Sequence, residues 1–389
     1  MIKPAKLFNA RNLFLGFALF ALAFLIFFWQ FVGLSPPQNV SSVNSIKTET
    51  VQPSTVIDAV TEVIQQTTTE KITSQRNCNR TFNAVAVGNN STTSSGLLTP
   101  GPFRWCSADS SARGAHQKVI SYSLFGTGQK ENVSVSDRFV KLLRNISVTA
   151  EKSYPGWIVR IYHNFRNQSE NPDEKSVFNQ LSELRCQFHH VDLCSLTEMI
   201  ASLTVSSLTP IDPDLLRGLN GRMFRYLVML DPNVDLFISR DIDSVIWQRE
   251  VDAVNQWLKS NFTFHLMRDH KFHSATILAG MWGVKLDQRR DLVQGLTRAM
   301  ILAGQNQQKS TDQDLLDTIL WPSAQYDVMA HDSYHCRNGK LNNKSPIKVL
   351  PFPTRRNCSC YVGGIGGTLK PEKCPEACRP PDHKDWEYC

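Results

Sequence analysis

Residues 234–247 read VDLFISRDIDSVIW, and this stretch decides how the rest of the chain is interpreted. Its first half is an apolar run typical of a buried strand, and the run leads into Arg240, Asp241 and Asp243 before the sequence turns apolar again. If Leu236–Arg240 is a central strand, the two aspartates lie just past its end and a period of two points their carboxylates the same way. The pattern predicts either a pair of metal-binding carboxylates or an ordinary charged turn.

The metal interpretation follows from charge. Two carboxylates that point the same way repel each other unless a cation lies between them. Their hard oxygen ligands suit Mn²⁺ or Mg²⁺, and either metal can bridge to the phosphates of a bound diphosphate. We therefore predict Asp241 and Asp243 as metal ligands with Mn²⁺ (or Mg²⁺) as cofactor, and Arg240 as a positive charge beside the same phosphates.

The segments upstream predict an open α/β sheet. A strand over Val119–Phe125, a helix over Asp137–Lys152 and a second strand over Trp157–His163 give a β-α-β rhythm. Ligands of such sheets bind at the carboxyl ends of the strands, so the Gly-x-Gly turn after the first strand is a candidate part of a nucleotide-binding site. The alternative is an ordinary turn, because such turns are also common without a ligand. The candidate donor-binding residues at this turn are Ser123, Phe125 and Gly126.

Downstream, residues 262–285 read FTFHLMRDHKFHSATILAGMWGVK and place a polar cluster between two apolar runs, which is typical of a pocket wall. We predict that the second run is a strand over residues 276–282. His270 and His273 fit a structural role as well as a substrate contact. The candidate donor-binding residues of this wall are Arg268, Asp269 and Gly280.

A third constellation, STDQDLLDTILWP, occupies residues 310–322. Thr311 and Asp314 have the spacing of a capping box, apolar residues follow at helical spacing, and Pro322 is predicted to end the helix. A carboxylate at a helix N-terminus near a sugar can steer the acceptor or stabilise positive charge on the donor carbon. Asp312 and Asp314 are therefore the candidate catalytic residues.

The C-terminal part offers further candidates. In VMAHDSYHC (residues 328–336), His331 is predicted to complete the metal shell, with Asp332 orienting it or binding directly and His335 as the alternative ligand. Further on, Arg355 is a candidate donor-binding residue. It precedes a glycine-rich turn that either folds over a pyrophosphate or is a loop tied by disulfides.

The first residues differ in composition from the rest. Residues 13–34 carry no charge and would reach about 33 Å as a helix, enough to cross a bilayer core of about 30 Å. Lysines and an arginine precede them, which predicts a cytosolic N-terminus and a lumenal remainder. The alternative is a cleaved signal peptide, which usually has a shorter apolar segment. The predicted parts are a cytosolic tail (1–12), a transmembrane anchor (13–34), a Ser/Thr-rich flexible stem (35–115) and a lumenal domain (116–389).

Cysteines and glycosylation sequons agree with a lumenal location. All ten cysteines follow the predicted anchor, and an even number is consistent with disulfides in an oxidising compartment. The alternative is a zinc site built from Cys358, Cys360, Cys374 and Cys378. Asn-x-Ser/Thr sequons, which are glycosylated only in the secretory route, include those that begin at Asn39, Asn79, Asn132, Asn145, Asn167, Asn261 and Asn357.

Charge excludes one class of partner. The formal net charge is +7, but no basic run with interleaved aromatic residues occurs, so nucleic acid is not an expected partner. A mild positive balance suits an anionic small substrate.

Together these motifs resemble a known architecture. An N-terminal anchor, a stem, a β-α-β start, a D-x-D after a strand, a D-Q-D that opens a helix and a later histidine look like a Golgi-type glycosyltransferase of the GT-A fold. The segments SRDIDS, FHLMRDH, ILAGMWGVK, DQDLLDTILWP, HDSYHC and FPTRR occur in an order similar to that of a group of uncharacterised predicted glycosyltransferases of bacteria and invertebrates, over residues 118–367. The resemblance implies a GT-A-like open mixed sheet flanked by helices, in which Asp241 and Asp243 match the metal-binding D-x-D.

The resemblance also implies an activity. The expected reaction moves a sugar from a nucleotide diphosphate donor, most simply a UDP-sugar, to a glycan or glycoprotein acceptor, in a single-pass type II protein of the Golgi or ER membrane. The D-Q-D is similar to that of glycogenin-like domains, which are retaining enzymes that use Mn²⁺, and by order along the chain His331 matches their later metal ligand. The chain lacks the H-x-x-G-x-x-K-P-W ending of that group. The D-Q-D favours retention, and the missing ending leaves inversion open.

Two other classes of function fit parts of the pattern. A catalytically inactive carbohydrate-binding or scaffold protein of the same fold would keep the core and the disulfides but need no metal. A metal-dependent phosphohydrolase would usually gather more His and Asp ligands around two ions than the single acidic pair seen here. Fold analogy does not decide among them, because function depends on the site.

Overall fold

The structure is a computed structural model, and it describes residues 103–126, 134–205, 210–336, 347–356, 360–364 and 372–389. The chain divides into two compact units, Met1–Arg76 and Asn77–Cys389, and every described residue belongs to the second. The predicted tail and anchor and most of the predicted stem lie outside the described residues. Within the described ranges, no helix combines the length and the apolar character that a bilayer crossing requires.

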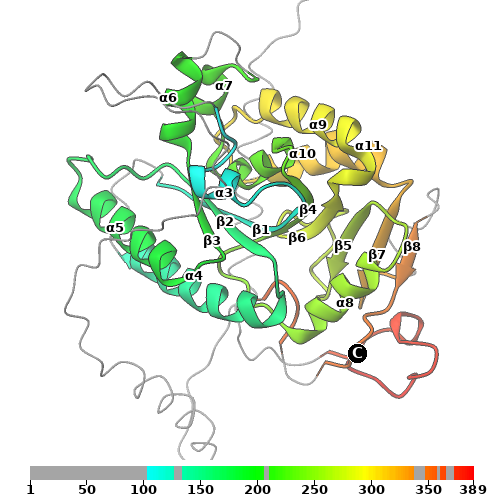
Figure 1. Ribbon diagram of the computed structural model, residues 1–389. Helices are drawn as coiled ribbons and strands as arrows, with labels where there is room; N and C mark the ends of the chain where they lie inside the picture. The colour runs from blue at the N-terminus through cyan, green and yellow to red at the C-terminus, as the bar shows by residue number, and fades with distance from the viewer. Residues whose placement is uncertain (1–102, 127–133, 206–209, 337–346, 357–359, 365–371) are drawn as a thin grey trace, which may run out of the picture. The chain divides into compact units, whose positions relative to one another are not determined.

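Helices and strands alternate along most of the described chain (Figure 1). Their bounds are α3 (Ala108–Ala112), β1 (Gln117–Leu124), α4 (Ser134–Ser153), β2 (Ile158–His163), α5 (Pro172–Gln187), β3 (Val191–Ser195), α6 (Leu196–Val205), α7 (Pro213–Arg217), the 3₁₀ helix η1 (Gly221–Leu230), β4 (Val234–Arg240), α8 (Gln248–Leu258), β5 (Phe264–Arg268), β6 (Met281–Lys285), α9 (Leu286–Ala303), α10 (Thr311–Leu315), the π-helical turn η2 (Leu316–Leu320), α11 (Trp321–Ala324), β7 (Val328–Asp332), β8 (Lys348–Leu350) and the 3₁₀ turn η3 (Glu376–Cys378).

The strands form one mixed sheet of eight in the order β3-β2-β1-β4-β6-β5-β7-β8. β6 runs antiparallel to its neighbours β4 and β5, and all other pairs are parallel. The carboxyl ends of the other seven strands therefore meet at one edge of the sheet, where β6 begins. The α/β class, with a mixed sheet flanked by helices, is confirmed.

Both faces of the sheet are covered because apolar side chains alternate along buried strands. Val119 and Phe237 belong to the core that includes η1 and α9, whereas Ile120 and Ile238 belong to the core that includes α4 and α8. Figure 1 shows α9, α10 and α11 on one side of the sheet and α4, α5 and α8 on the other. The strands that lead to the predicted site residues are thus rigid central elements.

Two predicted elements differ from the structure. The strand predicted over residues 276–282 begins only at Met281, because the Met281 N–H donates to the Leu278 carbonyl in a turn. Pro322 does not end the helix that opens at Thr311. It lies in the first turn of α11, where a missing N–H is tolerated, and the wider π-helical turn η2 precedes it.

Residues 103–115, assigned to the stem from sequence, pack onto the domain. Trp105 is buried, and Cys106 forms a disulfide with Cys194 at the end of β3. The C-terminal segment carries two more disulfides, Cys336–Cys378 and Cys374–Cys389, and Cys186 and Cys360 are also disulfide-bonded. Cys374 and Cys378 are therefore not zinc ligands but members of two different disulfides, which together tie the chain end to the segment after β7.

Candidate functional site at the carboxyl edge of the sheet

The strand order reverses between β1 and β4. The chain passes from β1 to β2 and β3 on one side and then returns to place β4 on the other side of β1 (Figure 1). Such a reversal leaves a crevice outside the carboxyl ends of the two strands, where ligands of open α/β sheets bind. β1 and β4 are parallel with Ser121 opposite Ser239, so the turn after β1 and the acidic pair after β4 leave the sheet at the same edge.

The acidic pair lies at this reversal. Asp241 follows the last residue of β4, its side chain is 49% exposed, and its carbonyl accepts a hydrogen bond from the Ser244 N–H in a tight turn. A Cβ atom on Gly280 would overlap the Asp241 carboxylate, so glycine makes room for this side chain at the start of β6. Asp243 is half-buried two residues on. The carboxylates are thus presented by a rigid strand end, as the sequence suggested.

Arg225 of η1 joins Asp241 to Asp312. Its Nη1 donates to Asp241 Oδ1 (2.5 Å) and to the Arg240 carbonyl (3.0 Å), and its Nη2 donates to Asp312 Oδ2 (2.8 Å). Burial alone would lower the pKa of Arg225, but the two carboxylates, Asp241 first, raise it above its ordinary value. The structure therefore brings the D-x-D and the D-Q-D together through an arginine that sequence reasoning missed.

The three residues of the D-Q-D have different surroundings. Asp312 is buried against Arg225, whereas Asp314 is exposed and accepts a hydrogen bond from the Ser310 hydroxyl (2.7 Å). Gln313 accepts from the Ala279 N–H (3.1 Å) and donates to the Ile277 carbonyl, which holds the segment before Gly280 in place.

The predicted capping box is absent from this helix start. The Thr311 hydroxyl lies 2.8 Å from the Gln308 carbonyl and 2.9 Å from the Asn306 carbonyl, and Ser310 at the N-cap makes no side-chain capping bond. The preceding loop offers carbonyl acceptors to Thr311, and these replace the predicted bond to the helix N–H.

The turn after β1 is tied to η1. Ser123 Oγ accepts from the Arg225 N–H (2.8 Å), and the Gly126 N–H donates to Asn164 Oδ1 (3.1 Å). Phe125 packs so closely over Gly221 that a Cβ there would overlap its ring. These three predicted residues thus lie at or just after the carboxyl end of β1, beside the strand-order reversal.

Arg240 is placed away from the solvent side of the acidic pair. Its guanidinium is 2% exposed and pairs with Glu250 of α8 at 2.7 Å, beside the buried rings of Tyr122 and Tyr154. Alternation along β4 explains this, because neighbours on a strand point to opposite faces. The structure assigns Arg240 a buried ion pair, and Arg225 supplies the cation beside Asp241.

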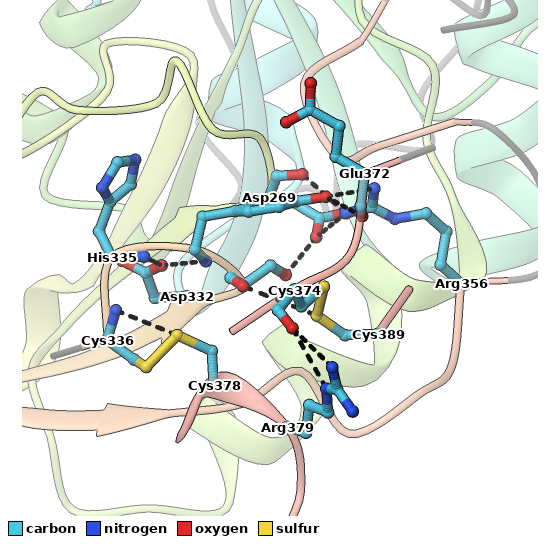
Figure 2. The surroundings of a disulfide bond; sticks show 12 residues. Asp269, Asp332, His335, Cys336, Arg356, Glu372, Cys374, Cys378, Arg379 and Cys389 are labelled. Carbon is cyan, nitrogen blue, oxygen red and sulfur yellow. Dashed lines mark hydrogen bonds and ion pairs between the residues drawn. A yellow bond between two sulfur atoms is a disulfide. The ribbon is translucent and has the colours of Figure 1, made fainter. Parts of the chain in front are cut away.

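Asp269 is the centre of a buried ion network (Figure 2). Arg249 donates to both of its oxygens at 3.1 Å, and Arg356 Nη2 (2.7 Å), Ser333 Oγ (2.5 Å) and the Val362 N–H (3.0 Å) supply the other bonds. Burial alone would raise the pKa of Asp269, but the two arginines lower it below its ordinary value. This carboxylate joins β5 to the C-terminal segment.

Of the other two predicted donor-binding cations, one is in a buried ion pair and one is exposed. Arg268, at the end of β5, forms a buried ion pair with Asp332 opposite it on β7. Asp332 Oδ1 also accepts from the N–H groups of Tyr334 (2.8 Å) and His335 (2.6 Å). Arg355 is exposed on the segment after β8.

His331 lies within β7 and is fully buried. His265 Nε2–H donates to His331 Nδ1 and His331 Nε2–H donates to Gln256 Oε1, each at 2.8 Å. Both ring nitrogens are thus engaged, and no lone pair faces a ligand. The order of the motifs along the chain suggested that His331 lies beside Asp241 and Asp243, but the structure does not place it there. His331 lies in the core because β7 is buried on both faces.

Among the residues that the structure describes, no group of three or more His, Cys, Asp or Glu side chains is arranged to hold a metal ion.

Buried neutral histidines predict acid sensitivity. Burial lowers the pKa of His163 to about 4 and of His331 to about 3, and it lowers that of His265 well below 6.5. The unfolded chain binds protons at these residues from about pH 6.5 downward while the folded protein does not, so stability falls as pH falls. We expect the free energy of unfolding to decrease by up to about 1.4 kcal/mol per pH unit for each such histidine.

Urea denaturation at pH 7.5, 6.5, 5.5 and 4.5 measures this slope. His163→Phe, whose ring would lie near Phe165 and Phe178, should flatten it, whereas His116→Gln on the surface should not. An unfolding free energy that is constant from pH 7.5 to 4.5 would contradict the assignment of neutral buried histidines.

Gly280→Ala perturbs the acidic pair directly. The added methyl group would overlap the Asp241 carboxylate and displace it from Arg225, so we expect about tenfold weaker ligand binding by the acidic pair and a smaller unfolding free energy. Gly295→Ala is the matched control, because its Cβ meets nothing within 4 Å and alanine should stabilise α9 by about 1 kcal/mol. Unfolding curves and metal titrations of both variants decide the matter, and unchanged binding in Gly280→Ala would contradict the placement of Asp241.

No protein-family model matches this chain, and a search of curated proteins finds no relative.

Proposed function

We propose that this chain is a metal-dependent glycosyltransferase of GT-A-like fold that moves a sugar from a nucleotide diphosphate donor to a glycan or glycoprotein acceptor. The observation that carries the proposal is the position of Asp241 and Asp243 directly after β4, at the strand-order reversal beside β1. A ligand at this edge meets two carboxylates on a rigid strand end and the Ser123–Gly126 turn. The resemblance of the chain's motifs to glycosyltransferases makes UDP-sugars the first donors to test.

The acidic pair fits a hard divalent cation. Mg²⁺ is usually bound by one or two carboxylates together with waters and substrate phosphates, so a cage of three protein ligands is not required. Arg225 donates to Asp241 Oδ1, so Oδ2 is the Asp241 oxygen proposed to bind the cation, and the half-buried Asp243 is the second proposed ligand. Bound there, Mn²⁺ or Mg²⁺ would neutralise charge that develops on the leaving diphosphate.

The two catalytic candidates take different roles in this proposal. Asp314 is the exposed carboxylate at the start of α10, so it is the group proposed to act at the sugar. In an inverting reaction it accepts the proton of the acceptor hydroxyl, and in a retaining reaction it stabilises positive charge on the donor carbon. Asp312 is buried and pairs with Arg225, so it is not the group proposed to contact the sugar.

We further propose that the protein is a type II membrane protein of the Golgi or ER, with residues 13–34 as its anchor and the sheet domain in the lumen. The disulfides Cys106–Cys194, Cys336–Cys378 and Cys374–Cys389 support an oxidising compartment. Three described sequon residues are exposed, as glycosylation requires: Asn145, Asn167 and Asn261.

A panel of nucleotide sugars tests the proposed function. The purified protein is mixed with each donor in the presence of Mn²⁺ or of EDTA, and both the melting temperature and sugar release are followed. Stabilisation and slow hydrolysis with one donor, only with Mn²⁺, is the expected result and names the sugar to use in acceptor screening.

A catalytically inactive scaffold of the same fold is the second candidate. The ion pair of Asp241 with Arg225 favours it, because the carboxylate has a partner without any metal. If no donor stabilises the protein in either condition, the charged residues of SRDIDS serve only ion pairs and turns at the end of β4. The inactive scaffold is then the better account.

A further inference from the structure

One buried cation serves two carboxylates at the proposed site. The Arg225 guanidinium is 5% exposed, and it contacts Asp241, which is 49% exposed, on one side and Asp312, which is 7% exposed, on the other. The trio joins η1 to the residue that follows β4 and to α10, and Arg225 and Asp312 are 87 residues apart in the sequence. Its exposed end is the predicted metal ligand Asp241, and its buried end is Asp312.

The position of Arg225 is fixed by its main chain as well. Its N–H donates to Ser123 Oγ (2.8 Å), and its carbonyl accepts from Ser121 Oγ (2.8 Å), so η1 is fastened to β1 at this residue. Its Nη1 also donates to the Arg240 carbonyl (3.0 Å), the last residue of β4. The guanidinium therefore sits at the β1–β4 reversal with little freedom to move.

The Arg225 bond to Asp241 uses one oxygen and leaves the other. Oδ1 accepts from Nη1, whereas Oδ2 lies over Gly280. The single bond from Nη1 holds Oδ1 beside Arg225 and so limits the directions in which Oδ2 can point. Asp312, held at the other end of the fork, balances the charge of Arg225 when a divalent cation approaches.

We propose that Arg225 is a positioning residue for the metal–diphosphate site, and that Asp312 acts on that site only through Arg225. This inference rests on the proposed function, and it adds a residue that the motifs did not identify. Carboxylates that bind metals are generally oriented by hydrogen-bond partners behind them, and loss of such a partner weakens metal binding by about 10–100-fold.

The test is a double-mutant cycle on Mn²⁺ affinity. Mn²⁺ binding is followed by water proton relaxation, with Mn²⁺ alone and with Mn²⁺ plus UDP, in the natural protein, Arg225→Gln, Asp312→Asn and the double variant. Asp317→Asn is the matched control, because it removes a half-buried carboxylate five residues farther along the same helical segment. Urea unfolding of each variant separates loss of affinity from loss of structure.

We expect Arg225→Gln to weaken Mn²⁺ binding by about 10–100-fold and Asp312→Asn by about tenfold. The double variant should bind no more weakly than Arg225→Gln, because Asp312 has no separate route to the metal. It should also be more stable than Arg225→Gln, since it removes the buried charge that this variant leaves unpaired. Asp317→Asn should bind as the natural protein does.

Three outcomes would overturn the inference. Equal Mn²⁺ affinity of the natural protein and Asp312→Asn removes the role of Asp312. Tighter binding by Arg225→Gln makes Arg225 a competitor for Asp241 and not its positioning residue. If the natural protein binds no Mn²⁺ with or without UDP, the proposed function fails and the inference fails with it.

Discussion

Asp243→Asn is expected to lower sugar transfer by about a thousandfold, or about 4 kcal/mol of transition-state stabilisation. The change keeps the shape of the side chain but removes one of the two carboxylates after β4 that are proposed to hold the metal, so the metal proposed to neutralise the leaving diphosphate would be lost. The unfolding free energy should change little, because the side chain is half-buried at the strand end. The measurement is donor turnover at saturating Mn²⁺, with unfolding curves for the same preparations.

Asp235→Asn is the matched control for this prediction. Asp235 lies on the same strand but near its amino end, where it pairs with Arg290 and His116. Its replacement should leave turnover unchanged. Equal turnover by Asp243→Asn and the natural protein would show that the acidic pair is not the metal site.

The second large effect concerns stability. Asp269→Asn is expected to cost about 3–5 kcal/mol of unfolding free energy, because it leaves Arg249 and Arg356 buried without their shared carboxylate. The segment containing Val362 should be released at the same time, since the Val362 N–H loses a charged acceptor. Chemical denaturation measures the cost, and limited proteolysis measures the release.

An exposed ion pair in the same region provides the comparison. Lys271 and Glu372 are 40% and 50% exposed, so Glu372→Gln should cost less than about 1 kcal/mol. If Asp269→Asn costs no more than Glu372→Gln, the buried network does not hold the C-terminal segment to β5.

The sequence predicted the parts of the site that depend on local pattern. An apolar run that ends in charges placed β4 and the acidic pair correctly, and the β-α-β rhythm placed β1, α4 and β2. These predictions succeed because strand burial and helix periodicity depend on residues that are neighbours in the sequence. Whether Asp241 and Asp243 bind a metal stays a prediction.

Arg225 was missed because its contacts with the two aspartates form only when the chain folds. Its two carboxylate partners lie 16 and 87 residues away, and no local spacing relates them. The available signal was a single charge inside the apolar segment MFRYLVML, which is buried almost throughout in η1. The same signal drew attention to Arg240, but only the structure shows that Arg240 turns into the core and Arg225 turns to the acidic pair.

His331 and Asp269 show the opposite error, because both were predicted as site residues and both belong to buried hydrogen-bond networks. Both are polar residues after or within apolar runs, and from sequence they were indistinguishable from site residues. The structure surrounds His331 with His265 and Gln256, and Asp269 with two arginines. Buried polar groups are generally hydrogen-bonded within the fold, so a polar residue in a strand indicates a network as readily as a ligand.

The most direct test of the central claim is calorimetric titration of UDP into the protein with Mn²⁺ and with EDTA, repeated with Asp241→Asn/Asp243→Asn. The account predicts saturable binding only with Mn²⁺, and its loss when the two carboxylates after β4 are removed. Binding that is equal with Mn²⁺ and EDTA and unchanged in the double variant would contradict it, as would the absence of binding in every condition.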